Sequence, residues 1–155
     1  MNYTEERAPL FKWVKPLYSG GFAFYTRADD PKSYSSEADI KGNILLARTA
    51  EASKGLLAEI PGVTVVTVES DLAAFDLLER GRGDLLLTGQ LMAKTLLIRS
   101  GRLADFRLAY EFRPAAVSLG CSLKTSDSAI AKLVEANKGL DDFRDQVLDR
   151  YWSPQ

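Results

Sequence analysis

Apolar positions along the chain follow two spacings, one typical of strands and one typical of helices. Short apolar runs, several of them rich in β-branched residues, predict strands at residues 21–27, 44–47, 63–70, 84–87, 106–113 and 115–123. Apolar residues at helical intervals predict helices at residues 50–59, 70–81 and 89–99, and two more within 125–152 that are separated at 137–139. Strands that alternate with helices of about ten residues are typical of an α/β fold with a largely parallel sheet.

The most regular of these segments covers residues 70–81. Leu72, Phe75 and Leu78 recur every three positions and predict one apolar helix face. Ser70 is the predicted N-cap of this helix, and Gly81 is its predicted end. A strand directly before the helix and another directly after it support the α/β prediction.

Composition limits the classes of function. The chain has 155 residues, of which 46% are hydrophobic and 26% charged, a balance typical of one globular domain or of two small lobes. Its 20 basic and 21 acidic residues are well mixed, so there is no basic footprint for nucleic acid. No apolar run is long enough to predict insertion into a membrane.

The chemistry-bearing residues disfavour an enzyme. The chain contains no histidine, which removes histidine-based triads, most zinc sites and the usual general base near neutral pH. The one cysteine, Cys121, lies in an apolar run and is interpreted as a small core residue. Four acidic residues that supply carboxylates show no motif spacing, namely Glu51, Asp71, Asp84 and Glu111. We therefore predict no catalytic residue, no metal and no cofactor.

Four stretches in a fixed order indicate a family. They are YTEERAPLFKWVKPLYSGGFAFYTRAD, DIKGNILLAR, AAFDLLERGRGDLLLTG and LKTSDSAIAKLVEANKGLDDFRDQVLDRYW. Together they resemble the family 3 extracellular solute-binding proteins, the periplasmic receptors that deliver polar amino acids and similar solutes to ABC transporters. The resemblance covers essentially the whole chain.

The resemblance implies a periplasmic-binding-protein-like (type II) fold with three α/β/α layers. Members have two lobes, the chain crosses the hinge twice, and the ligand lies between the lobes. On that pattern residues 21–112 are a complete second lobe, and residues 1–20 and 113–155 are remnants of the first. The opening part of the first lobe is then expected before Met1.

The resemblance also assigns candidate ligand-binding residues. The arginine of a T-x-x-R segment binds the ligand's carboxylate in the family, and here that segment is Thr4 to Arg7. The alternative for Arg7 is a solvated side chain beside two glutamates. Thr49 matches a hydroxyl position after the first strand of the second lobe, and an ordinary helix N-cap is its alternative.

Thr88 and Gln90 stand where a strand ends and a helix begins, the place at which α/β sheets bind ligands. A simple strand–helix turn is the alternative interpretation. In the family an acidic residue shortly after the preceding strand pairs with the ligand's amino group, but here that position falls at or near Gly89. An α-amino acid ligand would then lack its counter-charge.

The favoured function is a non-catalytic solute-binding module, truncated, for a small polar solute such as an amino acid or a carboxylate, with an ABC transporter permease as partner. The alternative is a self-associating interaction protein that has lost ligand binding. Apolar helix faces and an exposed strand edge predict a homodimer in either case. The resemblance implies a periplasmic location, whereas the chain as written has no export signal and would be cytoplasmic if Met1 is the true start.

Overall fold

The computed structural model describes residues 1, 3 and 5–152, and the side chains of residues 49, 51, 52, 115, 151 and 152 are not described. The chain divides into two compact units. Unit 1 consists of Met1–Gly21 and Pro114–Gln155, and unit 2 of Phe22–Arg113. Each unit is described by itself.

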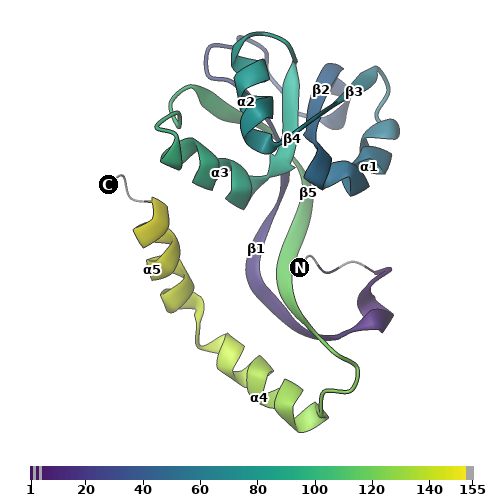
Figure 1. Ribbon diagram of the computed structural model, residues 1–155, viewed down its shortest axis with the longest axis vertical. Helices are drawn as coiled ribbons and strands as arrows, with labels where there is room; N and C mark the ends of the chain where they lie inside the picture. The colour runs from purple at the N-terminus through teal and green to yellow at the C-terminus, as the bar shows by residue number, and fades with distance from the viewer. Residues whose placement is uncertain (2, 4, 153–155) are drawn as a thin grey trace. The chain divides into compact units, whose positions relative to one another are not determined.

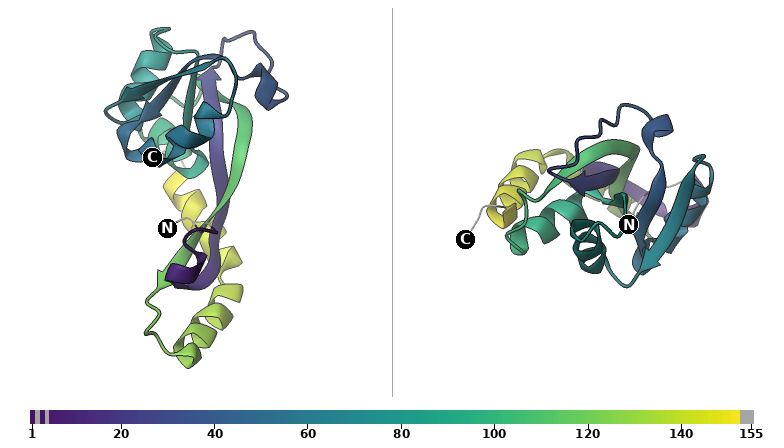
Figure 2. Two further views of the ribbon diagram at one scale, coloured as in Figure 1. Left: turned by 90° about the vertical axis from the view of Figure 1, so that its right-hand side faces the viewer. Right: turned by 90° about the horizontal axis from the view of Figure 1, so that it is seen from above.

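The strands form one five-stranded sheet in the order β3-β2-β4-β1-β5. The strands are β1 (Lys12–Arg27), β2 (Gly42–Ala47), β3 (Val63–Val68), β4 (Leu85–Gly89) and β5 (Phe106–Cys121). β2 is parallel to β3 and β4, and β1 is antiparallel to β4. β1 and β5 are neighbours, as Figures 1 and 2 show. The predicted α/β class is confirmed. The sheet was predicted to be largely parallel, and its strands β3, β2 and β4 are parallel to one another.

The helices follow the strands along the chain. They are α1 (Lys54–Ala58), α2 (Asp71–Glu79), α3 (Gln90–Arg99), α4 (Asp127–Lys138) and α5 (Asp141–Trp152), with short 3-10 helices η1 (Ala8–Leu10), η2 (Glu37–Asp39) and η3 (Arg48–Ser53). None of the helices in the described residues has both the length and the apolar character that a membrane crossing requires.

Helices lie on both sides of the sheet of unit 2 (Figure 1), and its core forms two clusters. Side chains alternate between the faces of a strand, so Leu45 of β2 points to one side and its neighbours Ile44 and Leu46 to the other. Leu45 packs in a cluster with α2 and α3, which includes Phe75, Leu78, Ala93 and Leu97. Ile44 and Leu46 pack in a second cluster with Leu57 of α1. Unit 2 therefore has the three α/β/α layers that the resemblance implies.

The predicted ends of α2 are confirmed. The Ser70 hydroxyl accepts a hydrogen bond from the Ala73 amide at 3.2 Å, which makes Ser70 the N-cap. Gly81 follows the helix with a φ of +67°, a left-handed conformation that side chains other than glycine rarely adopt.

Three predicted boundaries are wrong. α1 begins at Lys54 and not near residue 50, because the chain first forms 3-10 turns that meet in a kink at Ala50. Thr49 thus lies inside η3 and is not the N-cap of α1. β5 runs through Pro114 as one strand, since β5 is at the edge of the sheet, where a missing N–H is tolerated. β1 likewise begins at Lys12 and not at residue 21.

Unit 1 has few buried side chains of its own. The chain start pairs with β5, where Ser118 N–H donates to the carbonyl of Met1 at 2.7 Å and Tyr3 N–H to that of Ala116 at 3.2 Å. Among the described residues of this unit, only Val14 and Ser118 are fully buried, and α4 has no buried residue. The break between α4 and α5 falls at Gly139, as predicted.

Candidate functional site

The carboxyl ends of three parallel strands meet at one edge of unit 2. Leu46 of β2 pairs with Leu87 of β4, and Ala47 pairs with Val68 of β3. The residues that follow each strand therefore lie along the same edge. In open α/β sheets this is the edge at which ligands bind.

The end of β4 supplies Thr88, Gly89 and Gln90. Thr88 is buried, with 2% of its surface exposed, and pairs with Ala23 of the antiparallel strand β1. Gly89 is the N-cap of α3, with extended backbone and no capping side chain. A methyl group added to Gly89 would meet no atom within 4 Å, so there is open space at this position.

Gln90, the first residue of α3, contacts an acidic residue of β5. Its side-chain amide Nε2 donates a hydrogen bond to Glu111 Oε1 at 3.3 Å. Glu111 is exposed, whereas its neighbour Phe112 is buried in the cluster around α1. The result is a carboxylate in contact with the side chain of the first residue of α3.

The neighbouring strands end in a surface ion pair. Arg48, after β2, and Glu69, after β3, approach to 3.6 Å between Nη2 and Oε2, and both side chains are mostly exposed. Such a pair contributes little to stability because water screens both charges. It leaves a polar surface of both signs along the edge.

The four predicted ligand-binding residues have different outcomes. Thr88 and Gln90 lie together around Gly89 in unit 2. The backbone of Thr49 is in η3, directly after β2, but its side chain is outside the described residues. Arg7 is exposed and belongs to unit 1, where its carbonyl accepts from the Leu10 amide at 3.0 Å, and Thr4 is outside the described residues. Glu111 was not among the predicted ligand-binding residues.

Asp84, the other acidic residue close to β4 in sequence, has a structural role. Its Oδ2 accepts a hydrogen bond from the Asn43 backbone N–H at 2.8 Å, which ties the start of β4 to the start of β2. Lys32 Nζ lies 3.8 Å from the other carboxylate oxygen. Asp84 is thus at the amino end of the parallel strands, opposite to the edge that carries Thr88 and Gln90.

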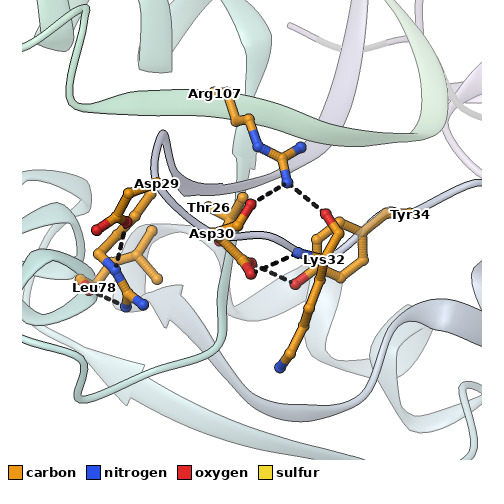
Figure 3. A network of polar contacts seen from close by, with 8 residues as sticks. Thr26, Asp29, Asp30, Lys32, Tyr34, Leu78 and Arg107 are labelled. Carbon is orange, nitrogen blue, oxygen red and sulfur yellow. Dashed lines mark hydrogen bonds and ion pairs between the residues drawn. The ribbon is translucent and has the colours of Figure 1, made fainter.

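A second polar cluster centres on Asp30 in the loop after β1 (Figure 3). Asp30 Oδ2 accepts from the hydroxyls of Thr26 at 2.7 Å and Tyr34 at 2.8 Å, and Oδ1 accepts from Lys32 N–H at 3.0 Å. Arg107 of β5 donates to the carbonyls of Asp30 and Lys32 at 3.1 Å and 2.6 Å. The side-chain oxygens of this cluster bond to the loop itself, so it fastens the loop and is not a candidate site.

The same contacts shift two pKa values. Burial and the hydrogen bond to Asp30 raise the pKa of Tyr34 to about 12. Burial alone would raise the pKa of Asp30, but the hydrogen bonds from Lys32, Thr26 and Tyr34 together lower it. Both shifts favour a neutral Tyr34 that donates to a charged Asp30.

No group of three or more histidine, cysteine, aspartate or glutamate side chains in the described residues is arranged to hold a metal ion. Cys121 is a free, half-buried thiol.

The fold is similar to that of solved solute-binding proteins, whereas no protein-family model and no curated protein matches the chain. The P235GK mutant of ArgBP from T. maritima aligns with a TM-score of 0.71 and 18% identity, over 98% of this chain and 66% of that one. AbpA from Streptococcus pneumoniae, an amino acid ABC transporter substrate-binding protein bound to L-arginine, aligns at 0.72 and 16%, over 98% and 65%. The VFT2 domain of Bordetella pertussis BvgS aligns at 0.68 and 18%, over 99% and 65%.

These matches define the class of fold. The chain is an α/β module of the periplasmic-binding-protein type, as the sequence predicts. It spans about two thirds of the length of the solved chains. At 16–18% identity the likeness establishes the fold alone.

Proposed function

We propose that this protein is a non-catalytic solute-binding module that takes a small polar solute such as an amino acid, as the solute-binding component of an ABC-type transporter outside the cytoplasm. The observation that supports this most directly is the edge formed by Thr88, Gly89 and Gln90, where a buried strand ends at the start of α3 next to open space. The fold shared with AbpA, which was solved with L-arginine, supports the same class of ligand.

The proposal assigns the two units to two lobes. Unit 2 corresponds to the second lobe expected at residues 21–112, and unit 1 to the first-lobe segments expected at 1–20 and 113–155. Thr88, Gln90 and Thr49 then belong to the second lobe, and Arg7 to the first. Interaction with a transporter permease follows from the proposal and has its own test, which is co-purification with a permease.

The test is a calorimetric titration of the purified protein with single amino acids and small carboxylates. We expect one class of solute to bind. Thr88→Val replaces the hydroxyl with a methyl group of almost the same volume. This variant should weaken solute binding by several fold. The matched control is Thr64→Val, the same change at an exposed position of β3. If no solute binds, or if both variants bind like wild type, the assignment of this edge is wrong.

The self-associating alternative has one observation in its favour. Unit 1 exposes large apolar side chains on its C-terminal helices and the connection between them, namely Leu133, Val134, Leu140 and Phe143. We propose a homodimer that covers them, since apolar faces of this kind are commonly buried in an interface. Light scattering should give twice the chain mass of 17.1 kDa, and Phe143→Glu should halve it. A wild-type monomer at micromolar concentration would exclude this alternative.

A further inference from the structure

We propose that the outer edge of β3 is an interaction surface, and that its occupant is β3 of a second copy of this chain, paired antiparallel about a two-fold axis. This pairing joins the sheets of two copies into one. The inference goes beyond the proposed function and does not depend on solute binding. It concerns unit 2, whereas the exposed apolar residues of α4 and α5 belong to unit 1.

The outer edge of β3 has no partner within the chain. β3 is at one end of the strand order, and its ladder is with β2. Among the described residues, no backbone hydrogen bond joins β3 to a loop or a helix. An edge of this kind presents a row of N–H and C=O groups that another strand can pair with. The edge strand β5 differs, because Arg107 donates to the carbonyls of Asp30 and Lys32 in the loop after β1.

The sequence of β3 favours pairing with another strand. Its six residues are all valine or threonine, which are among the best strand formers. Proteins commonly protect an edge strand with a charged residue or a proline, and β3 contains neither. β5 contains both, since Arg107, Arg113 and Pro114 belong to it. Of the two edge strands, β3 is therefore the one suited to accept a partner strand.

A two-fold axis at Val65 pairs β3 with itself. Opposite residues of an antiparallel pair lie on the same face of the sheet, so a symmetric pair has one residue that faces its own copy. With Val65 at the axis, Thr64 faces Val66 of the other copy. Val63 likewise faces Thr67. Each pair joins two β-branched side chains, and no pair brings like charges together.

Charges at the two ends of β3 complement each other in this arrangement. Lys41 is exposed at the amino end, where its Cγ lies 3.7 Å from the position of a methyl group on Gly62. Glu69 follows β3 at the carboxyl end and is mostly exposed. Antiparallel pairing at Val65 places the carboxyl end of each copy beside the amino end of the other. Lys41 and Glu69 of the two copies then approach each other twice, whereas a parallel pair would place lysine beside lysine.

The first test is disulfide cross-linking in a Cys121→Ser background, which removes the one native thiol. Val65→Cys places two thiols opposite each other at the axis. Opposite Cα atoms of an antiparallel pair are about 4.5–5.5 Å apart, a separation that fits a disulfide. We expect oxidation at micromolar concentration to give a linked dimer. The matched control is Leu108→Cys, an exposed residue of the other edge strand, which should cross-link at least about tenfold more slowly.

The second test reverses the charges at the ends of β3. Lys41→Glu places a glutamate beside Glu69 of the other copy, and Glu69→Lys places a lysine beside Lys41. Each variant alone should pair about tenfold more weakly than wild type, measured by sedimentation equilibrium and by the rate of Val65→Cys cross-linking. An equimolar mixture of the two variants should recover the wild-type affinity, because both contacts of the mixed dimer then join a lysine to a glutamate. Misfolding of a variant cannot produce such a recovery.

Three results would overturn the pairing of β3. They are equal cross-linking rates for Val65→Cys and Leu108→Cys, charge variants that pair as wild type does, and a mixture that does not recover. A dimer that dissociates with Phe143→Glu and not with Lys41→Glu would come from unit 1 and would also overturn it. Sedimentation of the charge variants keeps Val65 and decides the question if Val65→Cys does not fold. Solute titration of the same variants is independent, so failure of this inference leaves the proposed function standing.

Discussion

Gly83 lies against the core of unit 2, and its replacement by alanine tests the packing there. A methyl group at this position would lie 2.6, 2.7 and 3.0 Å from Cγ, Cδ1 and Cδ2 of Leu45. Leu45 has no exposed surface and packs in the cluster with α2 and α3. All three branch atoms of Leu45 are too close, so the whole side chain would have to move inside a filled core.

The expected cost follows from this geometry. Overpacking a well-packed core by one methyl group destabilises a protein by about 1–3 kcal/mol, because side chains leave their preferred rotamers. Gly55 in α1 offers the matched control, since a methyl group there meets no atom within 4 Å. Gly55→Ala should stabilise by about 0.5–1 kcal/mol, because alanine loses less backbone entropy than glycine in a helix. The same substitution therefore has opposite signs at the two positions.

The assay is urea unfolding followed by far-UV circular dichroism. Tryptophan fluorescence is unsuitable as the main probe, because Trp13 and Trp152 both lie outside unit 2. With a slope of about 2 kcal/mol per molar urea, a 2 kcal/mol loss lowers the midpoint by about 1 M. An unchanged midpoint for Gly83→Ala would refute close packing against Leu45. A lowered midpoint for Gly55→Ala would show that α1 is not helical at this residue.

Three further predictions concern caps and charge. Ser70→Ala should lower the free energy of unfolding by about 1 kcal/mol, because the amide of Ala73 loses its capping partner; urea unfolding measures this, and no change would contradict the N-cap. The pKa of Tyr34 is raised to about 12 from 10.0, so its contribution to stability is complete below pH 10 and is lost as the pH rises through 12. The difference in urea midpoint between wild type and Tyr34→Phe should accordingly shrink across that pH range, and a constant difference would argue against the bond to Asp30. Gly89→Asp should raise the unfolding temperature, because the new carboxylate has space and would cap α3; a lower temperature would mean that repulsion from Glu111 dominates.

The parts of the fold that local pattern determines were predictable. Ser70 and Gly81 act within one segment, so the sequence was sufficient to place α2. Of the apolar face predicted for it, Phe75 and Leu78 are buried, but Leu72 in the first turn is 44% exposed. The start of α1 was not predictable from the same rules, since the chain forms 3-10 turns around Ala50 before the helix begins. The strand break predicted at Pro114 was also wrong. A proline is tolerated in an edge strand, and which strand lies at the edge depends on the strand order of the whole sheet.

The candidate site divides in the same way. Thr88 and Gln90 were predictable because they stand at a strand–helix junction that the sequence marks. Glu111 was not, because it reaches Gln90 from 21 residues away. β1 lies between β4 and β5 in the sheet, and no local sequence pattern predicts this strand order. A charged residue between Tyr110 and Phe112 was the local indication, but Arg107 and Arg113 in the same strand are charged as well, so the pattern does not name a partner.

The position of an acidic residue at this edge determines whether its charge is balanced by the amino end of α3. A carboxylate at residue 89 would be the N-cap of α3, and its oxygens would accept from the first amides of that helix. Its charge would then be partly balanced by the helix itself. Glu111 comes from a different strand, and its Oε1 accepts a hydrogen bond from the side-chain amide of Gln90 and not from the backbone amides of α3. A glycine at 89 thus leaves α3 without a capping side chain, and the Gly89→Asp variant measures how much such a cap contributes to stability.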